Sequence, residues 1–220
     1  HDFYDPQVIK DAIERTHDIA HNQIGDVKAD RTVKLPALTK LVPVDDLERI
    51  RKDLGEVKGQ EDEAVAFREL KELAIKGLKW RKTTTQPYID RLKEELDVIK
   101  HLKLSRYFLT YYWIMDVVTK QQLTGPGRGS AAGSLLAYVL NITQVDAVKH
   151  GTLFARFLNK FKAGMADIDS DFSDREAAVN IISEFFGAEN VIPVSNFAQL
   201  QLASLCKDLA RLFDVPFELV

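Results

Sequence analysis

The chain has 220 residues, of which 45 % are hydrophobic and 29 % charged, so it can form one well-cored domain and is not disordered. The net charge of −3 gives no indication of a nucleic-acid partner, and a single cysteine, Cys206, excludes a disulfide framework. No signal peptide is evident and the apolar stretch Tyr107–Val118 is too short to span a bilayer, so we expect no membrane partner.

The first predicted element is a helix that begins at Asp5 and Pro6, an N-cap residue followed by proline at the first helical position. Apolar residues then recur at helical spacing as far as Ala20. His17 and His21 lie one turn apart on this helix and could form half of a metal site. No third ligand is evident nearby, so we favour a surface or partly buried pair.

Three further helices are predicted over residues 44–54, residues 62–79, and from Pro87 to Leu102. The segment Tyr107–Val118 is rich in aromatic residues and apolar on nearly all sides, which is typical of a buried central helix. A base-stacking platform is the alternative interpretation of these aromatic side chains, and packing in the core is favoured.

Residues 125–134 form a glycine-rich loop that leads into an apolar helix over residues 135–140. Glycine lets the backbone approach a ligand closely, and free N–H groups at a helix start favour phosphate. Arg128 adds a forked donor and Ser130 a hydroxyl. The ending of a Walker loop and the glycine spacing of a dinucleotide fold are both absent, and a glycine-rich loop alone is weak evidence.

Residues 166–172 (ADIDSDF) form an acidic run with three carboxylates at alternating positions. In a strand these carboxylates would share one face, where they repel each other unless a cation is bound. Oxygen ligands suit Mg²⁺, so the run indicates a magnesium site for phosphate chemistry, with a solvated acidic turn as the alternative. Residues 117–166, directly before the aspartates, hold six Lys and Arg and one acidic residue, which fits a polyanion site or a basic solvated face.

Residues 173–176 (SDRE) predict a capping box, and the helix that follows ends at Gly187. A short strand is predicted over residues 191–194 and a leucine-rich helix up to Leu212. A glycine-serine helix start followed by Asp-x-Asp on a strand is a much stronger signal than either motif alone. Together they indicate a triphosphate cradle beside a metal site, as in a nucleotidyltransferase.

Residues 125–138 (GPGRGSAAGSLLAY) resemble the GPGRGSxAGSLVAY signature of the bacterial family C replicative DNA polymerases, the DNA polymerase III alpha subunits. The likeness continues without a gap through residues 153–159 (LFARFLN) to residues 165–172 (MADIDSDF), which resemble MPDIDIDF. It is weaker as far as Arg211 and faint before Gln86.

The resemblance implies an α+β, helix-rich fold, namely a polymerase-beta-like nucleotidyltransferase palm with a mixed sheet and flanking helices. The palm would cover residues 1–197, with a helical part to about residue 120 and the loop and Asp-x-Asp core over about 121–197. Residues 198–220 would begin a helical thumb.

By the same resemblance, Asp167 and Asp169 are two of three catalytic aspartates and bind two Mg²⁺ ions, while Asp171 orients a neighbour. The residues implied at the nucleotide phosphates are Arg128, Gly129, Ser130, Arg156 and Lys162. Lys162 stands where the family has arginine, which keeps the charge but loses bidentate phosphate binding. We therefore expect a divergent member of the family.

The implied activity is that of a DNA-directed DNA polymerase, with primer–template DNA and deoxynucleoside triphosphates as partners. The third aspartate and the DNA-binding domains are expected beyond Val220, so we expect a fragment, or one piece of a split polymerase, that is inactive without other polymerase domains or a second chain. A cytoplasmic location, in a bacterium or a virus-infected bacterial host, is implied. The alternatives are a non-catalytic interaction module and a stand-alone nucleotidyltransferase with another acceptor.

Overall fold

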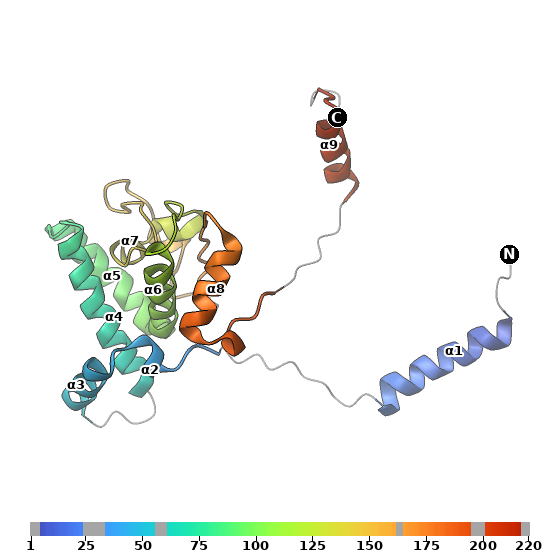
Figure 1. The fold of residues 1–220 in the computed structure, drawn as a ribbon, viewed down its shortest axis with the longest axis horizontal. Coiled ribbons are helices and arrows are strands. Elements are labelled where there is room, and N and C mark those ends of the chain that lie inside the picture. Colours follow the sequence, from blue (N-terminus) through green and yellow to red (C-terminus); the bar gives the residue numbers. More distant parts are fainter. Residues whose placement is uncertain (1–4, 24–33, 56–60, 162–164, 195–200, 217–220) are drawn as a thin grey trace. The chain divides into compact units, whose positions relative to one another are not determined.

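The structure is a computed structural model that describes residues 5–23, 34–55, 61–161, 165–194 and 201–216 (Figure 1). The chain divides into two compact units, His1–Leu35 and Pro36–Val220. Within the described ranges, every helix is too short or too polar to cross a membrane.

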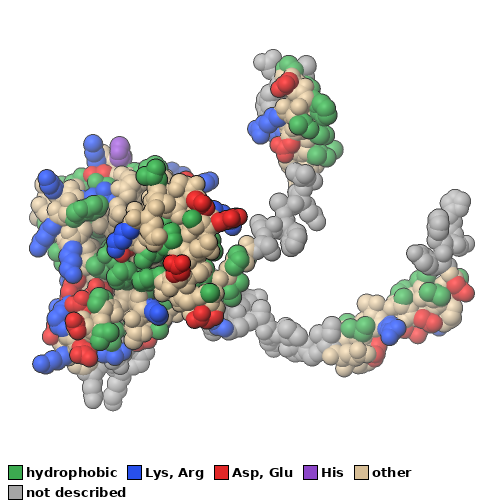
Figure 2. All heavy atoms as spheres, in the orientation of Figure 1, with side chains coloured by type: hydrophobic (Ala, Val, Ile, Leu, Met, Phe, Trp, Pro, Cys, Tyr) green, Lys and Arg blue, Asp and Glu red, His purple; other side chains and the backbone are tan. Residues whose placement is uncertain are grey.

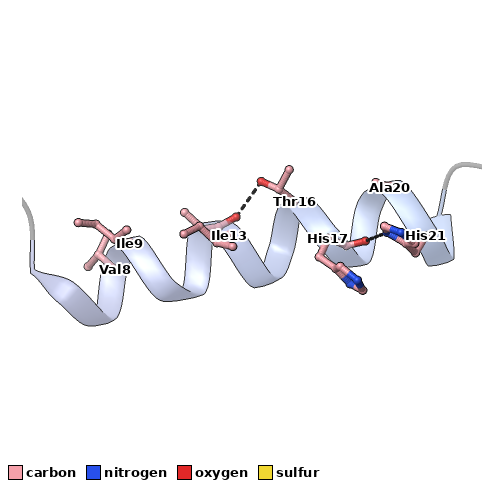
Figure 3. A pocket seen from close by; sticks show the side chains of 8 residues that line it. Val8, Ile9, Ile13, Thr16, His17, Ala20 and His21 are labelled. Atoms are coloured by element: carbon pink, nitrogen blue, oxygen red, sulfur yellow. Dashed lines mark hydrogen bonds between the residues drawn. The ribbon is translucent and has the colours of Figure 1, made fainter.

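The N-terminal unit is built on α1 (Pro6–Asp18), which continues into a short π-helix, η1 (Ile19–Gln23). The Asp5 side chain accepts a hydrogen bond of 2.8 Å from the backbone N–H of Gln7, so the predicted N-cap is confirmed. Apolar side chains such as Ile13 are exposed along this helix (Figure 3).

His17 and His21 are both exposed, and their stacked rings have centroids 4.1 Å apart. Nδ1 of His21 lies 3.0 Å from the carbonyl oxygen of His17, as Figure 3 shows. The described residues contain no group of three or more side chains that could hold a metal ion. Because both side chains are exposed, the interpretation of the two histidines as a surface pair is confirmed.

The larger unit is helical in the part that the structure describes. Its α-helices in the described ranges are α2 (Leu38–Leu41), α3 (Val44–Leu54), α4 (Glu61–Trp80), α5 (Gln86–Leu102), α6 (Ser105–Thr119), α7 (Leu135–Val139), α8 (Arg175–Phe186) and α9 (Leu202–Leu212). Among the residues that the structure describes, short 3₁₀ turns lie between these helices at η2 (Gly129–Gly133), η3 (Phe154–Arg156) and η4 (Ala188–Asn190). The predicted bounds of α3 are confirmed, and those of α4 and α5 agree closely.

α6 lies in the middle of the core, where it packs against α2, α4 and α8 (Figure 1). Phe108, Leu109 and Val118 on α6 are all 0 % exposed, which confirms the predicted buried central helix. Removing such large apolar side chains from water is the main favourable contribution to folding.

On the visible surface, acidic and basic side chains are interspersed (Figure 2), in keeping with the small net charge.

The predicted mixed sheet is wrong, because the described residues contain no strand, only isolated bridges. The acidic run meets the glycine-rich loop through two antiparallel bridges, Thr124 with Phe172 and Arg128 with Asp169. Gly127 between them has a φ of +107°, far from strand geometry, so pairing cannot continue along the loop. The α+β palm with flanking helices is replaced by a helical fold that carries one extended acidic segment.

Two local predictions also need correction. The N-cap of α8 is Asp174, whose side chain accepts a 3.0 Å hydrogen bond from the N–H of Ala177, whereas Ser173 donates to Gln122. Residues 191–194 form no strand. The expected domain boundary at residues 197 and 198 lies outside the described residues.

Candidate functional site

The aspartates of the acidic run alternate with more buried residues, which are the apolar Ala166 and Ile168 and the half-buried Ser170. Asp167, Asp169 and Asp171 are exposed, whereas Ala166 and Ile168 are only 6 % and 5 % exposed. An extended chain turns successive side chains to opposite sides, so burying one set presents the other to solvent. The carboxylates are therefore held outward even though no sheet forms.

Two tyrosines of α6 hold the acidic run from behind. The hydroxyl of Tyr107 donates to the carbonyl oxygen of Ala166 at 2.5 Å, and that of Tyr111, one turn later, donates to Ile168 at 2.8 Å. Burial raises the pKa of both tyrosines. The aromatic segment therefore serves the core, as favoured above, and also fixes the backbone on either side of Asp167.

The glycine-rich loop lies directly against the aspartates. Gly129 has a φ of +67°, and a Cβ atom added to it would lie 2.6 Å from Oδ2 of Asp169. The N–H of Gly125 donates to the carbonyl oxygen of Asp171 at 2.8 Å. The two motifs, forty residues apart in sequence, thus form one surface, and the absence of a side chain at Gly129 makes the close approach possible.

Arg128, expected at a phosphate, instead pairs with Asp171. Its Nη1 lies 3.1 Å from Oδ1 of Asp171, and both side chains are more than half exposed. An exposed pair of this kind adds little stability. It does support the expectation that Asp171 orients a neighbour.

A cleft of about 690 Å³ lies beside this surface. It is lined by Gly129, Ser130, Ala132, Gly133, His150, Gly151, Thr152, Leu153 and Arg156. Three of the predicted phosphate contacts, Gly129, Ser130 and Arg156, thus line the same cleft. Lys162 lies outside the described residues, and His150 is a cleft residue that the sequence reasoning missed.

The start of α7 is not the free phosphate site that the sequence suggests. The buried carboxylate of Glu95 on α5 accepts hydrogen bonds of 2.9 Å from the N–H groups of both Leu135 and Leu136. The Ser134 side chain caps the next N–H, that of Ala137, at 3.1 Å. The protein therefore supplies its own anion at this helix end, which leaves the cleft residues as the candidates for phosphate.

The donor set at the acidic run fits Mg²⁺. Two exposed carboxylates, Asp167 and Asp169, supply the oxygen ligands that Mg²⁺ prefers, and one or two carboxylates with substrate phosphates are its usual ligands. In the described ranges no third acidic, histidine or cysteine side chain joins them to complete a cluster. The adjoining cleft leaves room for a substrate to provide the rest.

Both motifs lie in a region that matches a known protein family. The family model of the bacterial DNA polymerase III alpha NTPase domain matches residues 68–220, from α4 onward, and so includes the glycine-rich loop and the acidic run.

Several curated relatives carry the name DNA polymerase III subunit alpha. That of Bacillus subtilis (strain 168) is 43 % identical over 150 residues, covering 66 % of this chain and 14 % of the relative. That of Ureaplasma parvum serovar 3 is 37 % identical over 159 residues, covering 69 % of this chain and 16 % of the relative. That of Aquifex aeolicus (strain VF5) is 38 % identical over 156 residues, covering 67 % of this chain and 13 % of the relative. The chain therefore spans only 13 to 16 % of the length of these relatives.

Proposed function

Because this chain belongs to the bacterial DNA polymerase III alpha family, we propose that it supplies the metal-binding and nucleotide-binding surface of a DNA-directed DNA polymerase. The observation that supports this most is the contact between the two motifs. Gly129 lies so close to Asp169 that an added Cβ atom would be 2.6 Å from Oδ2 of that carboxylate. The same glycine lines the cleft together with Arg156. A triphosphate in the cleft would lie beside carboxylates able to hold Mg²⁺.

The predicted residues keep their roles in this proposal, except Arg128, which pairs with Asp171. Asp167 and Asp169 would hold the two Mg²⁺ ions, which would supply positive charge against the triphosphate and activation of the primer 3′-hydroxyl. Ser130 and Arg156 contact the phosphates from the cleft, and Lys162 adds positive charge. Positioning and charge complementarity account for the catalysis, since this transfer requires little covalent chemistry from the protein.

The substrates in this proposal are primer–template DNA and deoxynucleoside triphosphates. The chain covers a small share of its relatives, so it would act together with further polymerase domains or with a second polymerase chain. Alone it would bind nucleotide but not extend a primer.

The test replaces the two aspartates one at a time. In a polymerase that contains this chain, we expect Asp167→Ala and Asp169→Ala each to lower the rate of primer extension by about a thousandfold or more, because each removes a proposed metal ligand. Extension of a labelled primer measures the effect, and Asp53→Ala, an exposed aspartate on α3, serves as the control that keeps full activity. Unchanged extension by either aspartate variant would refute the assignment.

The same proteins separate the alternatives. Mg²⁺-dependent binding of a deoxynucleoside triphosphate to this chain, lost in Asp167→Ala, counts against a non-catalytic interaction module. Transfer of labelled nucleotide to an acceptor other than a DNA primer would instead identify a stand-alone nucleotidyltransferase.

A further inference from the structure

Glu95 is a carboxylate that is 0 % exposed in the middle of α5, surrounded by hydrogen-bond donors. Its Oε1 accepts from Nε of Arg91 at 2.7 Å and from the N–H of Leu135 at 2.9 Å. Its Oε2 accepts from the hydroxyl of Ser134 at 2.8 Å and from the N–H of Leu136 at 2.9 Å. Four donors thus converge on one side chain.

This arrangement requires a group that only accepts hydrogen bonds. The hydroxyl of Ser134 also accepts from the N–H of Ala137, so its own proton is directed to Glu95. Backbone N–H groups cannot accept, so a glutamine amide would place its NH₂ against at least one donor. Burial raises the pKa of Glu95, while hydrogen bonds from Leu136, Arg91, Leu135 and Ser134 act in the opposite direction.

Arg91 extends the same arrangement to both sides of the cleft. Its Nη2 donates to the carbonyl oxygen of Gly133 at 3.1 Å and to that of Thr152 at 3.0 Å. Gly133 ends the glycine-rich loop and Thr152 belongs to the segment opposite, and both line the cleft. A single guanidinium therefore connects the two walls from behind while its Nε is held by Glu95.

A buried ion pair is weak evidence for stability, because apolar residues of similar volume often stabilise a core equally well. The contacts of this pair run to the backbone of the glycine-rich loop and of the wall opposite it. We propose that Arg91 and Glu95 are positioning residues that fix Gly129 and Ser130 relative to Arg156 and so set the shape of the cleft for a nucleoside triphosphate. This inference rests on the proposed function, because it assigns the cleft that ligand.

The test uses Glu95→Gln and Arg91→Lys, with two readouts on the chain. Glutamine keeps the shape of Glu95 but not its four acceptor positions, and lysine keeps the charge of Arg91 but cannot reach three partners at once. Hydrogen exchange of residues 129–137 measures how firmly the loop is held, and calorimetric titration with deoxyadenosine triphosphate and Mg²⁺ measures affinity. Glu94→Gln, the same change at the exposed neighbouring position, is the matched control.

In Glu95→Gln and in Arg91→Lys, the loop amides should exchange at a rate at least about tenfold higher. The affinity for the triphosphate should be at least about tenfold lower, as expected for a lost charged hydrogen bond. Ile99→Ala, a buried change at the far end of α5, should lower the melting temperature without this local effect. Arg91→Lys provides the test if Glu95→Gln does not fold.

The outcomes separate the two proposals. If the unchanged chain binds no triphosphate, the proposed function fails and the positioning role falls with it. If it binds, and the variants bind as well as Glu94→Gln or exchange their loop amides at the same rate, the positioning role alone is overturned.

Discussion

At the scale of single residues, the site depends on a glycine whose conformation and surroundings both exclude a side chain. Gly129 combines a φ of +67° with a clash of 2.6 Å between an added Cβ and Oδ2 of Asp169. Positive φ costs an L-residue roughly 1–2 kcal/mol, and the clash adds displacement of a carboxylate that we assign to metal binding. The cost of a positive φ can be separated from the cost of the clash, since Gly55 has a positive φ but open space around an added Cβ.

We predict that Gly129→Ala weakens Mg²⁺-dependent triphosphate binding by about tenfold or more, because the new methyl group displaces the Asp169 carboxylate. The control is Gly55→Ala, with a φ of +65° and no atom within 4 Å of the added Cβ. Gly55→Ala should lose roughly 1–3 kcal/mol of unfolding free energy, because Gly55 has φ +65° and ψ −160°, and should bind normally. Calorimetric titration and urea denaturation give the two values, and equal binding by both variants would contradict the role of Gly129.

At the scale of elements, α6 explains why the acidic run is extended without belonging to a sheet. Tyr107 and Tyr111, one turn apart, donate to carbonyl oxygens that a neighbouring strand would otherwise use. Pro126, in the loop on the other side, has no N–H to donate. Side-chain donors of a helix thus replace strand pairing, and the aspartates keep the alternation of a strand.

The stability of this arrangement should decline in alkali. Tyr107 and Tyr111 have raised pKa values in the folded protein, so their contribution is complete below about pH 10 and lost as the pH rises through the raised values. Each contributes up to about 1.4 kcal/mol of loss per pH unit in that range. Urea denaturation from pH 8 upward measures the loss.

The variant with both tyrosines changed to phenylalanine tests the cause. It should be less stable at pH 8, by about 0.5–1.5 kcal/mol for each hydrogen bond, and show a shallower alkaline decline. Some decline remains, because the hydrogen bond to Asp146 raises the pKa of Tyr88 to about 12. An identical alkaline slope in the double variant would show that the two hydroxyls do not act in this way.

At the scale of the whole molecule, the larger unit depends on the core around α6, which carries the site on its surface. Phe108 is 0 % exposed and meets Phe157 edge to face, with ring centroids 6.3 Å apart. Phe157 directly follows η3, which contains Arg156. The core is therefore continuous with the wall of the cleft.

We predict that Phe108→Ala lowers the free energy of unfolding by about 3–5 kcal/mol, because it removes a large buried ring and leaves a cavity. The same substitution at Phe161, which is 98 % exposed, should change stability by less than about 0.5 kcal/mol. Urea denaturation followed by circular dichroism compares the two. Similar losses would mean that the core is not centred on α6.

The helices were predictable because their signals are local. The bounds of α3 and the cap of α1 follow from apolar spacing and from a capping residue beside the helix start. Glu95 could not be assigned in this way, because its partners at Leu135 and Leu136 lie about forty residues away in sequence. An Arg91–Glu95 spacing of four residues is the only local signal of the pair, and many exposed helix pairs share it.

By itself the sequence determined most of the longer helices and the family, because periodicity, capping and motif order can all be read along the chain. It also named the residues that we propose for metal and phosphate. Only the tertiary structure decided how the acidic run is held and which group occupies the start of α7. Donors from α6 take the place of a sheet, and Glu95 occupies the helix start that appeared open to a phosphate. Both outcomes depend on which distant groups satisfy backbone N–H and C=O groups, and that is settled only when the helices pack.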